Sequence, residues 1–338
     1  MTRLGGRTVL ALSLALLGAC IAAAFSLGRF PIAAGDLATA LVARLTGQPS
    51  GLTPAVEAVI FSVRGPRVLA AVLIGAALAT AGAAFQGLFR NPLVSPDLPG
   101  ASSGAALGAV LGIFLSLPIL GIELLSFAGG LAAVGAVYAI GGALRGGDAV
   151  LVLVLTGIVV GSLLGAGIGL LKHLADPYNQ LPAITFWLLG SLAGFGTAEL
   201  VPLAAPVLIG MVALLLLRWR MNVMSLPDEE ARALGVATGP LRAAIVTAAT
   251  LVTAASVAAA GIVGWVGLVV PHLARFLVGP SFPRLLPTAA LLGGAYLLVI
   301  DTVARTAASV EIPLGILTAV VGTPFFIALL ARTRGGWS

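Results

Sequence analysis

Long apolar segments alternate with short polar or proline-rich breaks along nearly the whole chain. A helix needs about 20 apolar residues to cross the hydrocarbon core of a bilayer, and most of these segments approach that length. They predict ten membrane-spanning helices, with an interruption near 194–199 in the sixth. The predicted spans are 8–28, 67–89, 100–117, 122–143, 149–171, 184–217, 242–262, 264–278, 286–304 and 314–331.

The apolar runs are too uniform for the alternating pattern of a membrane β-barrel. We therefore expect one all-α polytopic membrane domain over residues 1–338. Composition agrees, because 59% of the residues are apolar and 9% are charged, whereas soluble domains carry about 25% charged residues. A soluble enzyme is thereby excluded.

Two rare residue types exclude further classes. A P-loop needs lysine followed by serine or threonine, and the only lysine, Lys172, precedes His173. Any ATP used by this protein must therefore be bound by another chain. The single cysteine, Cys20, excludes an internal disulfide and a cysteine-rich metal site.

The basic residues predict the orientation of the chain in the membrane. Cytoplasmic loops carry an excess of Lys and Arg, and a cytoplasmic N-terminus puts twelve basic residues inside and six outside. The inner set is Arg3, Arg7, Arg90, Arg145, Arg218, Arg220, Arg232, Arg242, Arg275, Arg284, Arg332 and Arg334; the outer set is Arg29, Arg44, Arg64, Arg67, Lys172 and Arg305.

The first span has a competing interpretation as a signal peptide. Leu17-Gly-Ala-Cys20 is similar to a lipoprotein cleavage box after a basic start. The apolar run continues past Cys20 to Leu27, which favours an intact span and leaves processing at Cys20 as the alternative.

Glycines recur at four-residue spacing in two predicted spans. Small residues at this spacing let helix backbones approach closely in lipid, which indicates either static packing or movement at a gate. One series is Gly104, Gly108 and Gly112; the other is Gly157, Gly161, Gly165 and Gly169.

Two breaks fall inside or beside apolar sequence. The run from Gly261 through Gly267 to Pro271-His272 cannot form one uniform helix, because proline removes a backbone donor and clashes with the preceding turn. Irregular backbone at membrane depth persists only where protein or a watery cavity satisfies it. The run from Asn91 to Pro96 is a similar stiff break, expected on the cytoplasmic side.

The longest cytoplasmic loop, 218–242, contains a helix signal. Ser225-Leu-Pro-Asp228 fits a capping box with proline near the helix start, and Gly235 suits the C-terminal cap. We expect a short helix of about two to three turns. It is either a surface helix or a coupling element that docks into a soluble partner.

Ionisable residues are scarce at the predicted span centres. Asp301, Arg305 and Glu311 gather around the outer end of the ninth span, and His272 adjoins Pro271. Ion-coupled transporters usually carry such residues near mid-membrane, so their scarcity indicates a pathway driven from outside the membrane. A channel or ion-coupled carrier remains the alternative. A serine hydrolase would need Ser102 or Ser103 with His173 or His272, and serines in a glycine-rich helix are more often packing residues.

Several segments together resemble the permease subunits of type II ABC importers of the FecCD type, which take up iron-siderophores, haem and cobalamin. The resemblance runs from about residue 60 to the C-terminus and is carried by motifs in the expected order. They are Arg64-Gly-Pro-Arg67, Gln86-Gly-Leu-Phe-Arg-Asn-Pro-Leu93, Gly100-Ala-Ser-Ser-Gly104, Ser225-Leu-Pro-Asp-Glu-Glu-Ala-Arg-Ala-Leu-Gly235, Gly264-Trp-Val-Gly-Leu-Val-Val-Pro-His-Leu-Ala-Arg275, Asp301-Thr-Val-Ala-Arg305, Glu311-Ile-Pro-Leu-Gly315 and Gly322-Thr-Pro-Phe-Phe326.

The resemblance implies an architecture and a set of partners. It implies ten spans in a bacterial inner membrane with both termini cytoplasmic, and a second permease copy, more often identical than different. It also implies two ATP-binding-cassette ATPase subunits below and a periplasmic binding protein above. ATP and Mg²⁺ would then sit on the partner ATPase, with no cofactor or metal on this chain and no nucleic-acid partner. This chain would be a transport subunit and not an enzyme.

The resemblance also implies roles for individual residues. Arg64, Arg67 and Arg305 would meet acidic residues of the binding protein, which suits guanidinium–carboxylate pairing. The gate set is Asn91, Leu93, Val150 and Leu151, with 150–151 aliphatic where a relative carries hydroxyls. From the glycine series we add Gly157, Gly161 and Gly165 as further gate or pathway candidates. The ATPase-coupling set is Ser225, Leu226, Pro227, Asp228, Glu229, Glu230, Ala231, Arg232, Leu234 and Gly235.

The sequence leaves the cargo open. Among the family's cargoes an iron-siderophore is expected first, then haem or cobalamin, with a molybdate-type oxyanion as an alternative. The binding protein, a separate chain, would set most of the specificity.

Overall fold

The structure is a computed structural model that describes residues 5–28, 30–97, 100–144 and 149–333, with the side chains of 149–150 and 329–333 outside the description. Within those residues the secondary structure is helical, as expected. The helices are α1 (Gly6–Ser26), α2 (Ala34–Thr46), α3 (Pro54–Ala58), the π-helix η1 (Val59–Arg64), α4 (Gly65–Leu88), α5 (Ala101–Phe114), α6 (Ile119–Ala143), α7 (Ala149–Leu174), α8 (Gln180–Leu189), α9 (Thr197–Val223), α10 (Asp228–Ala233), α11 (Thr238–Ala260), α12 (Val266–Val278), α13 (Phe282–Thr306) and α14 (Leu314–Thr333).

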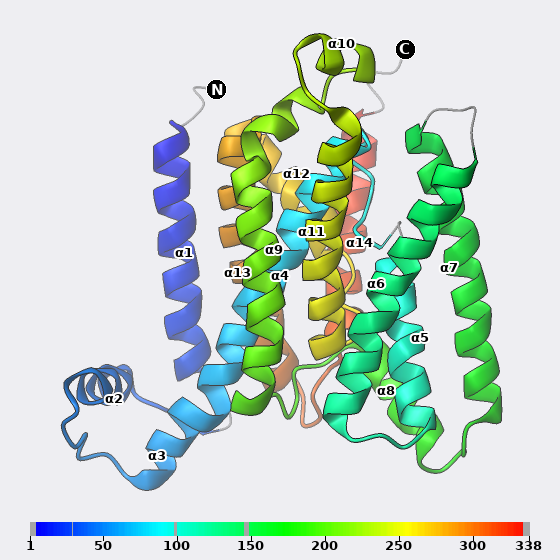
Figure 1. Ribbon diagram of the computed structural model, residues 1–338. Coiled ribbons are helices and arrows are strands. Elements are labelled where there is room, and N and C mark those ends of the chain that lie inside the picture. Colours follow the sequence, from blue (N-terminus) through cyan, green and yellow to red (C-terminus); the bar gives the residue numbers. More distant parts are fainter. Residues whose placement is uncertain (1–4, 29, 98–99, 145–148, 334–338) are drawn as a thin grey trace.

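The long helices form a bundle with two distinct ends (Figure 1). We call them the α10 end, where α1 begins and α14 finishes, and the α2 end, which also carries α3 and α8. Seven helices of the described residues are long and apolar enough to cross a membrane, and α5, α8, α12 and α14 are shorter apolar helices. The predicted sixth span is divided into α8 and α9 by an irregular segment at 190–196.

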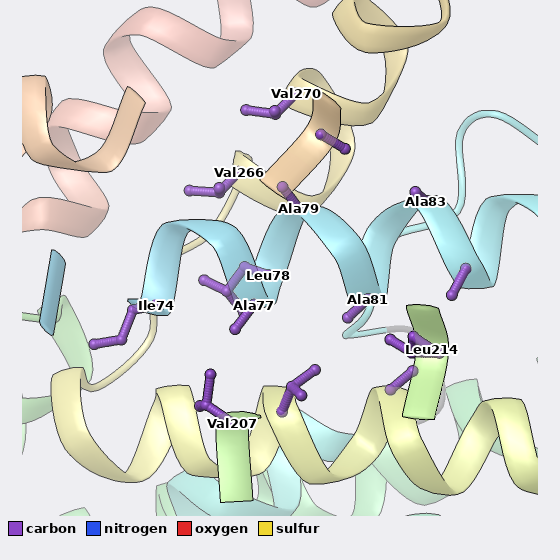
Figure 2. Packing of buried hydrophobic residues seen from close by; sticks show 14 of the residues in the cluster. Ile74, Ala77, Leu78, Ala79, Ala81, Ala83, Val207, Leu214, Val266 and Val270 are labelled. Atoms are coloured by element: carbon purple, nitrogen blue, oxygen red, sulfur yellow. The ribbon is translucent and has the colours of Figure 1, made fainter. Parts of the chain in front are cut away.

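Helix α4 forms the centre of the bundle. It is rich in alanine and glycine, and these small side chains allow neighbours to approach it from several directions. Figure 2 shows α4 between α12, which contributes Val266 and Val270, and the opposite neighbours α9 and α11, with Val207 and Leu214 of α9 facing α4. Most of α4 is therefore buried within a single chain.

The chain contains an internal repeat of helix lengths. Helices α4 to α7 have 24, 14, 25 and 26 residues, and α11 to α14 have 23, 13, 25 and 20. Corresponding helices run in opposite directions, so α5 runs toward the α2 end and α12 toward the α10 end (Figure 1). The second helix of each set is about half the length of its neighbours.

The predicted break before Pro271 exists, but Pro271 does not cause it. The chain leaves helical geometry at 261–265, where Gly261 and Trp265 both have φ of +69°, and Pro271 lies inside α12. Pro271 cannot donate to the carbonyl of Gly267. The side-chain amide of Gln86 of α4 replaces this missing donor, since its Nε2 lies 3.4 Å from the Gly267 oxygen and 3.3 Å from the Leu268 oxygen. Arg275 in turn donates to Gln86 Oε1 at 2.5 Å.

The second predicted span starts earlier than expected. Pro54–Leu88 forms one continuous apolar helical stretch, and it widens into η1 just before Pro66. A π-turn accommodates the missing donor and the bulk of a proline inside a helix. Neither α2 nor α3 was expected from the span pattern.

The two glycine series behave differently. On α5, a Cβ added to Gly104 or Gly108 would come within 2.3 or 2.1 Å of a backbone oxygen of α6, so this series is a close helix crossing, as predicted. On α7, Gly161 is near only Ser103 of α5, and Gly165 and Gly169 have no described atom within 4 Å of an added Cβ.

Candidate functional site

Three arginines and two acidic residues lie together at the α2 end. We call this set, Arg64, Arg67, Asp301, Arg305 and Glu311, the arginine cluster. Arg67 is its centre: Nε and Nη2 donate to Asp301 Oδ1 at 3.0 and 2.9 Å, and Nη1 and Nη2 donate to Glu311 at 2.8 and 2.9 Å. The side chain of Asp301 is 1% exposed, against 12% for Arg67 and 30% for Glu311.

The other two arginines bind main-chain carbonyls in the last turn of α1 and just after it. Arg64 donates to the oxygens of Phe25 and Phe30. Arg305 donates to Leu27 O at 2.9 Å and to Ala24 O, and its Nε lies 3.8 Å from Asp301. The cluster thus fastens α1, α4 and α13 to one another.

A cavity of about 240 Å³ opens among these side chains, with Phe30, Val59 and Val63 as apolar walls. The structure brings together the arginines that the sequence assigned to docking, and it engages each of them within the chain. With three guanidiniums and two carboxylates, the cluster keeps an excess positive charge that attracts an acidic side chain.

The predicted coupling segment contains a helix, but it is shorter than expected. Helix α10 spans six residues and begins after Pro227. The predicted capping box does not form, because Ser225 Oγ donates back to Met221 O of α9 at 3.4 Å. The predicted glycine cap is present: Gly235 has φ of +78° and donates to Arg232 O.

An ion pair fixes α10 to the bundle. Arg242 of α11 donates to both carboxylate oxygens of Asp228 at 2.9 Å, and the Arg242 side chain is only 11% exposed. Ala231 is buried beneath the helix. Glu229, Glu230, Arg232 and Leu234 form the exposed face. This face can contact a soluble partner while Asp228 holds the helix in place.

The predicted gate residues differ in how far the structure exposes them. Asn91 and Leu93 are exposed, and Asn91 Oδ1 accepts a hydrogen bond from Leu93 N at 2.9 Å. Leu151 is 55% exposed, and the side chain of Val150 lies outside the described residues. Gly157 is buried, Gly161 partly buried and Gly165 exposed.

The break at 91–97 is exposed at Asn91, Leu93 and Asp97 but buried at Val94 and Pro96. It folds into the bundle, and Pro96 contacts Gly267 of α12. Ser102 Oγ donates to Asp97 at this point. Asp97 belongs to no predicted span, so it does not contradict the scarcity of ionisable residues at the span centres. The partner of Ser102 is a carboxylate and not the histidine that a serine hydrolase would need.

Sequence reasoning missed three residues whose side chains hold the predicted elements in place. Gln86 and Arg275 belong to quoted motifs, yet only the structure pairs them, and Arg242 lies outside the predicted coupling helix that it holds. A polar residue inside an alanine-rich span, as Gln86 is, was the one available signal.

Comparison with known proteins agrees with this architecture. The model of the FecCD transport family matches residues 15–332. A solved structure described as an inward-facing ABC transporter of the metal-chelate type superposes with a TM-score of 0.87 at 36% identity, covering 96% of this chain and 99% of the other.

Named relatives differ in cargo. The molybdate import permease MolB of Haemophilus influenzae is 37% identical over 92% of this chain and 91% of its own. A probable iron chelatin permease of Helicobacter pylori is 40% identical over 82% of this chain and 83% of its own. Other relatives carry the names of haemin and cobalamin permeases. The chain is an ABC importer permease that belongs to the FecCD transport family.

Proposed function

We propose that the protein is the membrane subunit of an importer for a metal chelate, built from two copies of this chain, two ATPase subunits and a periplasmic binding protein. The observation that carries the proposal is the separation of two different surfaces at opposite ends of one bundle. The exposed face of α10 lies at one end and the positively charged arginine cluster at the other (Figure 1).

In this proposal the α10 end is cytoplasmic and α10 docks into the ATPase. ATP and Mg²⁺ are held by that partner. Closure of the two ATPases pushes α10, and the Asp228–Arg242 pair passes the displacement to α11. Packed helices switch between discrete arrangements and do not deform continuously. The membrane-spanning helices therefore move together to a second arrangement around Asn91, Leu93 and the start of α7.

An iron chelate is the cargo we favour, followed by haem and cobalamin. The support is the metal-chelate description of the structural neighbour and the names of several relatives. Molybdate is the competing cargo, because MolB aligns over nearly the whole chain.

Uptake by the reconstituted complex tests this function. The permease is co-purified with its ATPase, placed in liposomes and supplied with the binding protein loaded with ferric hydroxamate, haemin, cobalamin or molybdate. We expect ATP-dependent accumulation of the iron chelate. Flux driven by an ion gradient through the permease alone would contradict the proposal and favour a secondary carrier.

Arg64 and Arg305 are expected to bind the binding protein. The variant Arg64→Gln/Arg305→Gln removes two positive charges and leaves the Arg67–Asp301 pair intact. We expect the Kd for the binding protein to rise about tenfold or more, since a charged partner at an interface is worth more than about 1.4 kcal/mol. Surface plasmon resonance on nanodisc-embedded permease measures it. An unchanged Kd in a variant of native thermal stability would refute docking at this cluster.

Asp228 is expected to be needed for coupling but not for docking. In Asp228→Asn the neutral amide holds the buried Arg242 less tightly, a loss of about 1 kcal/mol or more. We expect ATP-dependent uptake to fall about fivefold while the ATPase still co-purifies. The charge swap Asp228→Arg/Arg242→Asp should recover part of the uptake. Native uptake in Asp228→Asn would contradict the coupling role of this ion pair.

A further inference from the structure

Asp97 lies much deeper in the bundle than its place in a connecting segment suggests. A Cβ added to Gly267 would lie 2.6 Å from Pro96 Cδ and 3.0 Å from the Leu78 carbonyl oxygen. Pro96 is therefore at the level of Leu78 of α4. At 1.5 Å per residue, Leu78 is about 15 Å inside the end of α4 at Leu88.

Contacts at the start of α5 place Asp97 at the same depth, independently of Pro96. Gly100 N donates to Asp97 O at 2.9 Å, which places Asp97 directly before α5. A Cβ added to Gly130 would lie 3.1 Å from the Ala101 oxygen, and Gly130 is near the middle of α6. Both neighbours place Asp97 about halfway through a hydrocarbon core of about 30 Å.

The carboxylate of Asp97 is held in position and is open on one side. Ser95 Oγ donates to Oδ2 at 2.8 Å and Ser102 Oγ donates to Oδ1. The residue is exposed in the single chain. Among the residues that the structure describes, it joins none of the ion pairs.

An exposed carboxylate at this depth cannot face lipid. Charged side chains within membrane spans face the bundle interior or a water-filled cavity, because hydrocarbon does not solvate them. The face that carries Asp97 must therefore be covered by water or by another protein surface.

We propose that Asp97 is a specificity-determining residue that places a fixed negative charge on the translocation pathway at mid-depth. This rests on the proposed import function and deepens it by naming the cargo class. A chelate of zero or positive net charge passes this point, and a dianionic oxyanion such as molybdate is repelled. In a dimer of identical chains the repulsion comes from two carboxylates.

Thiol labelling of the assembled permease–ATPase complex measures the charge at this point without any cargo. Cys20→Ser removes the native thiol, and Leu93→Cys supplies a reporter no more than about 14 Å along the chain from Asp97. The rates of modification by a cationic and an anionic methanethiosulfonate of similar size are compared with and without Asp97→Asn. The matched control is Asp36→Asn on α2.

We expect Asp97→Asn to lower the ratio of cationic to anionic labelling rates about threefold at low ionic strength, from one unit charge at this distance in a largely aqueous space. The control should leave the ratio unchanged. An unchanged ratio in Asp97→Asn, or a reporter that neither reagent modifies, would overturn the proposal.

Uptake assays separate this inference from the proposed function. With the binding protein present, Asp97→Asn should raise molybdate uptake relative to neutral ferric hydroxamate about threefold or more. If the native complex transports none of the cargoes, the import function fails, while the labelling ratio still decides whether Asp97 sets the local charge.

Discussion

Asp301→Ala should destabilise the protein strongly, because it leaves the guanidinium of Arg67 without its most buried partner. Asp301 is 1% exposed and accepts three hydrogen bonds from Arg67, which is itself nearly buried. Removing one member of a buried ion pair leaves an incompletely compensated charge and costs about 3–5 kcal/mol. On the entropy scale of soluble proteins this lowers the unfolding temperature by about 5 °C for a chain of this length. Thermal unfolding in detergent, followed by tryptophan fluorescence, measures it.

Two further variants test whether the loss of stability in Asp301→Ala comes from the uncompensated charge of Arg67. Glu311→Ala removes the more exposed partner and leaves the bonds to Asp301, so we expect a loss of about 1 kcal/mol or less. The double variant Arg67→Met/Asp301→Leu replaces the pair by apolar side chains and should recover most of the lost stability. It should also weaken binding-protein docking if Arg67 contributes to it. An unfolding temperature equal to that of the native chain in Asp301→Ala would contradict the burial of this pair.

The spans could be predicted because lipid imposes one strong requirement on sequence. A segment that crosses hydrocarbon must be apolar and must satisfy its own backbone bonds, so apolar length alone located α1, α6, α11 and α13 within a few residues. Helix α10 was predictable for a different reason. Proline at its start and Gly235 at its end are local signals that do not depend on tertiary structure.

The depth of the 91–97 segment in the bundle and the partners of the buried arginines could not be predicted. Both depend on contacts between segments that are distant in the sequence. The break at 91–97 reads as a surface turn, and it enters the bundle only because Gly267 leaves room for Pro96. Likewise the sequence suggests outward-facing charges at the arginines that we predicted to meet a binding protein. Their burial follows from Asp301 and from carbonyls at the end of α1, which no local pattern connects to Arg64 or Arg305.

The crossing of α4 and α13 is expected to tolerate no side chain at its contact point. A Cβ added to Gly75 would lie 2.2 Å from the Gly293 oxygen, and one added to Gly293 would lie 2.3 Å from the Gly75 oxygen. Backbone atoms cannot move aside as a flexible side chain can, so Gly75→Ala must separate the two helices. We expect a loss of about 2–3 kcal/mol from overpacking, although alanine is intrinsically the better helix former by about 1 kcal/mol.

The matched control is Gly18→Ala on α1, where no described atom lies within 4 Å of the added Cβ. It should be neutral or stabilising by up to about 1 kcal/mol. Gly75→Ala/Gly293→Ala should cost less than the sum of the two single variants, because helices separated by the first methyl already make room for the second. Thermal unfolding of the four proteins measures this cycle. A Gly75→Ala variant as stable as Gly18→Ala would mean that α4 and α13 do not meet backbone to backbone.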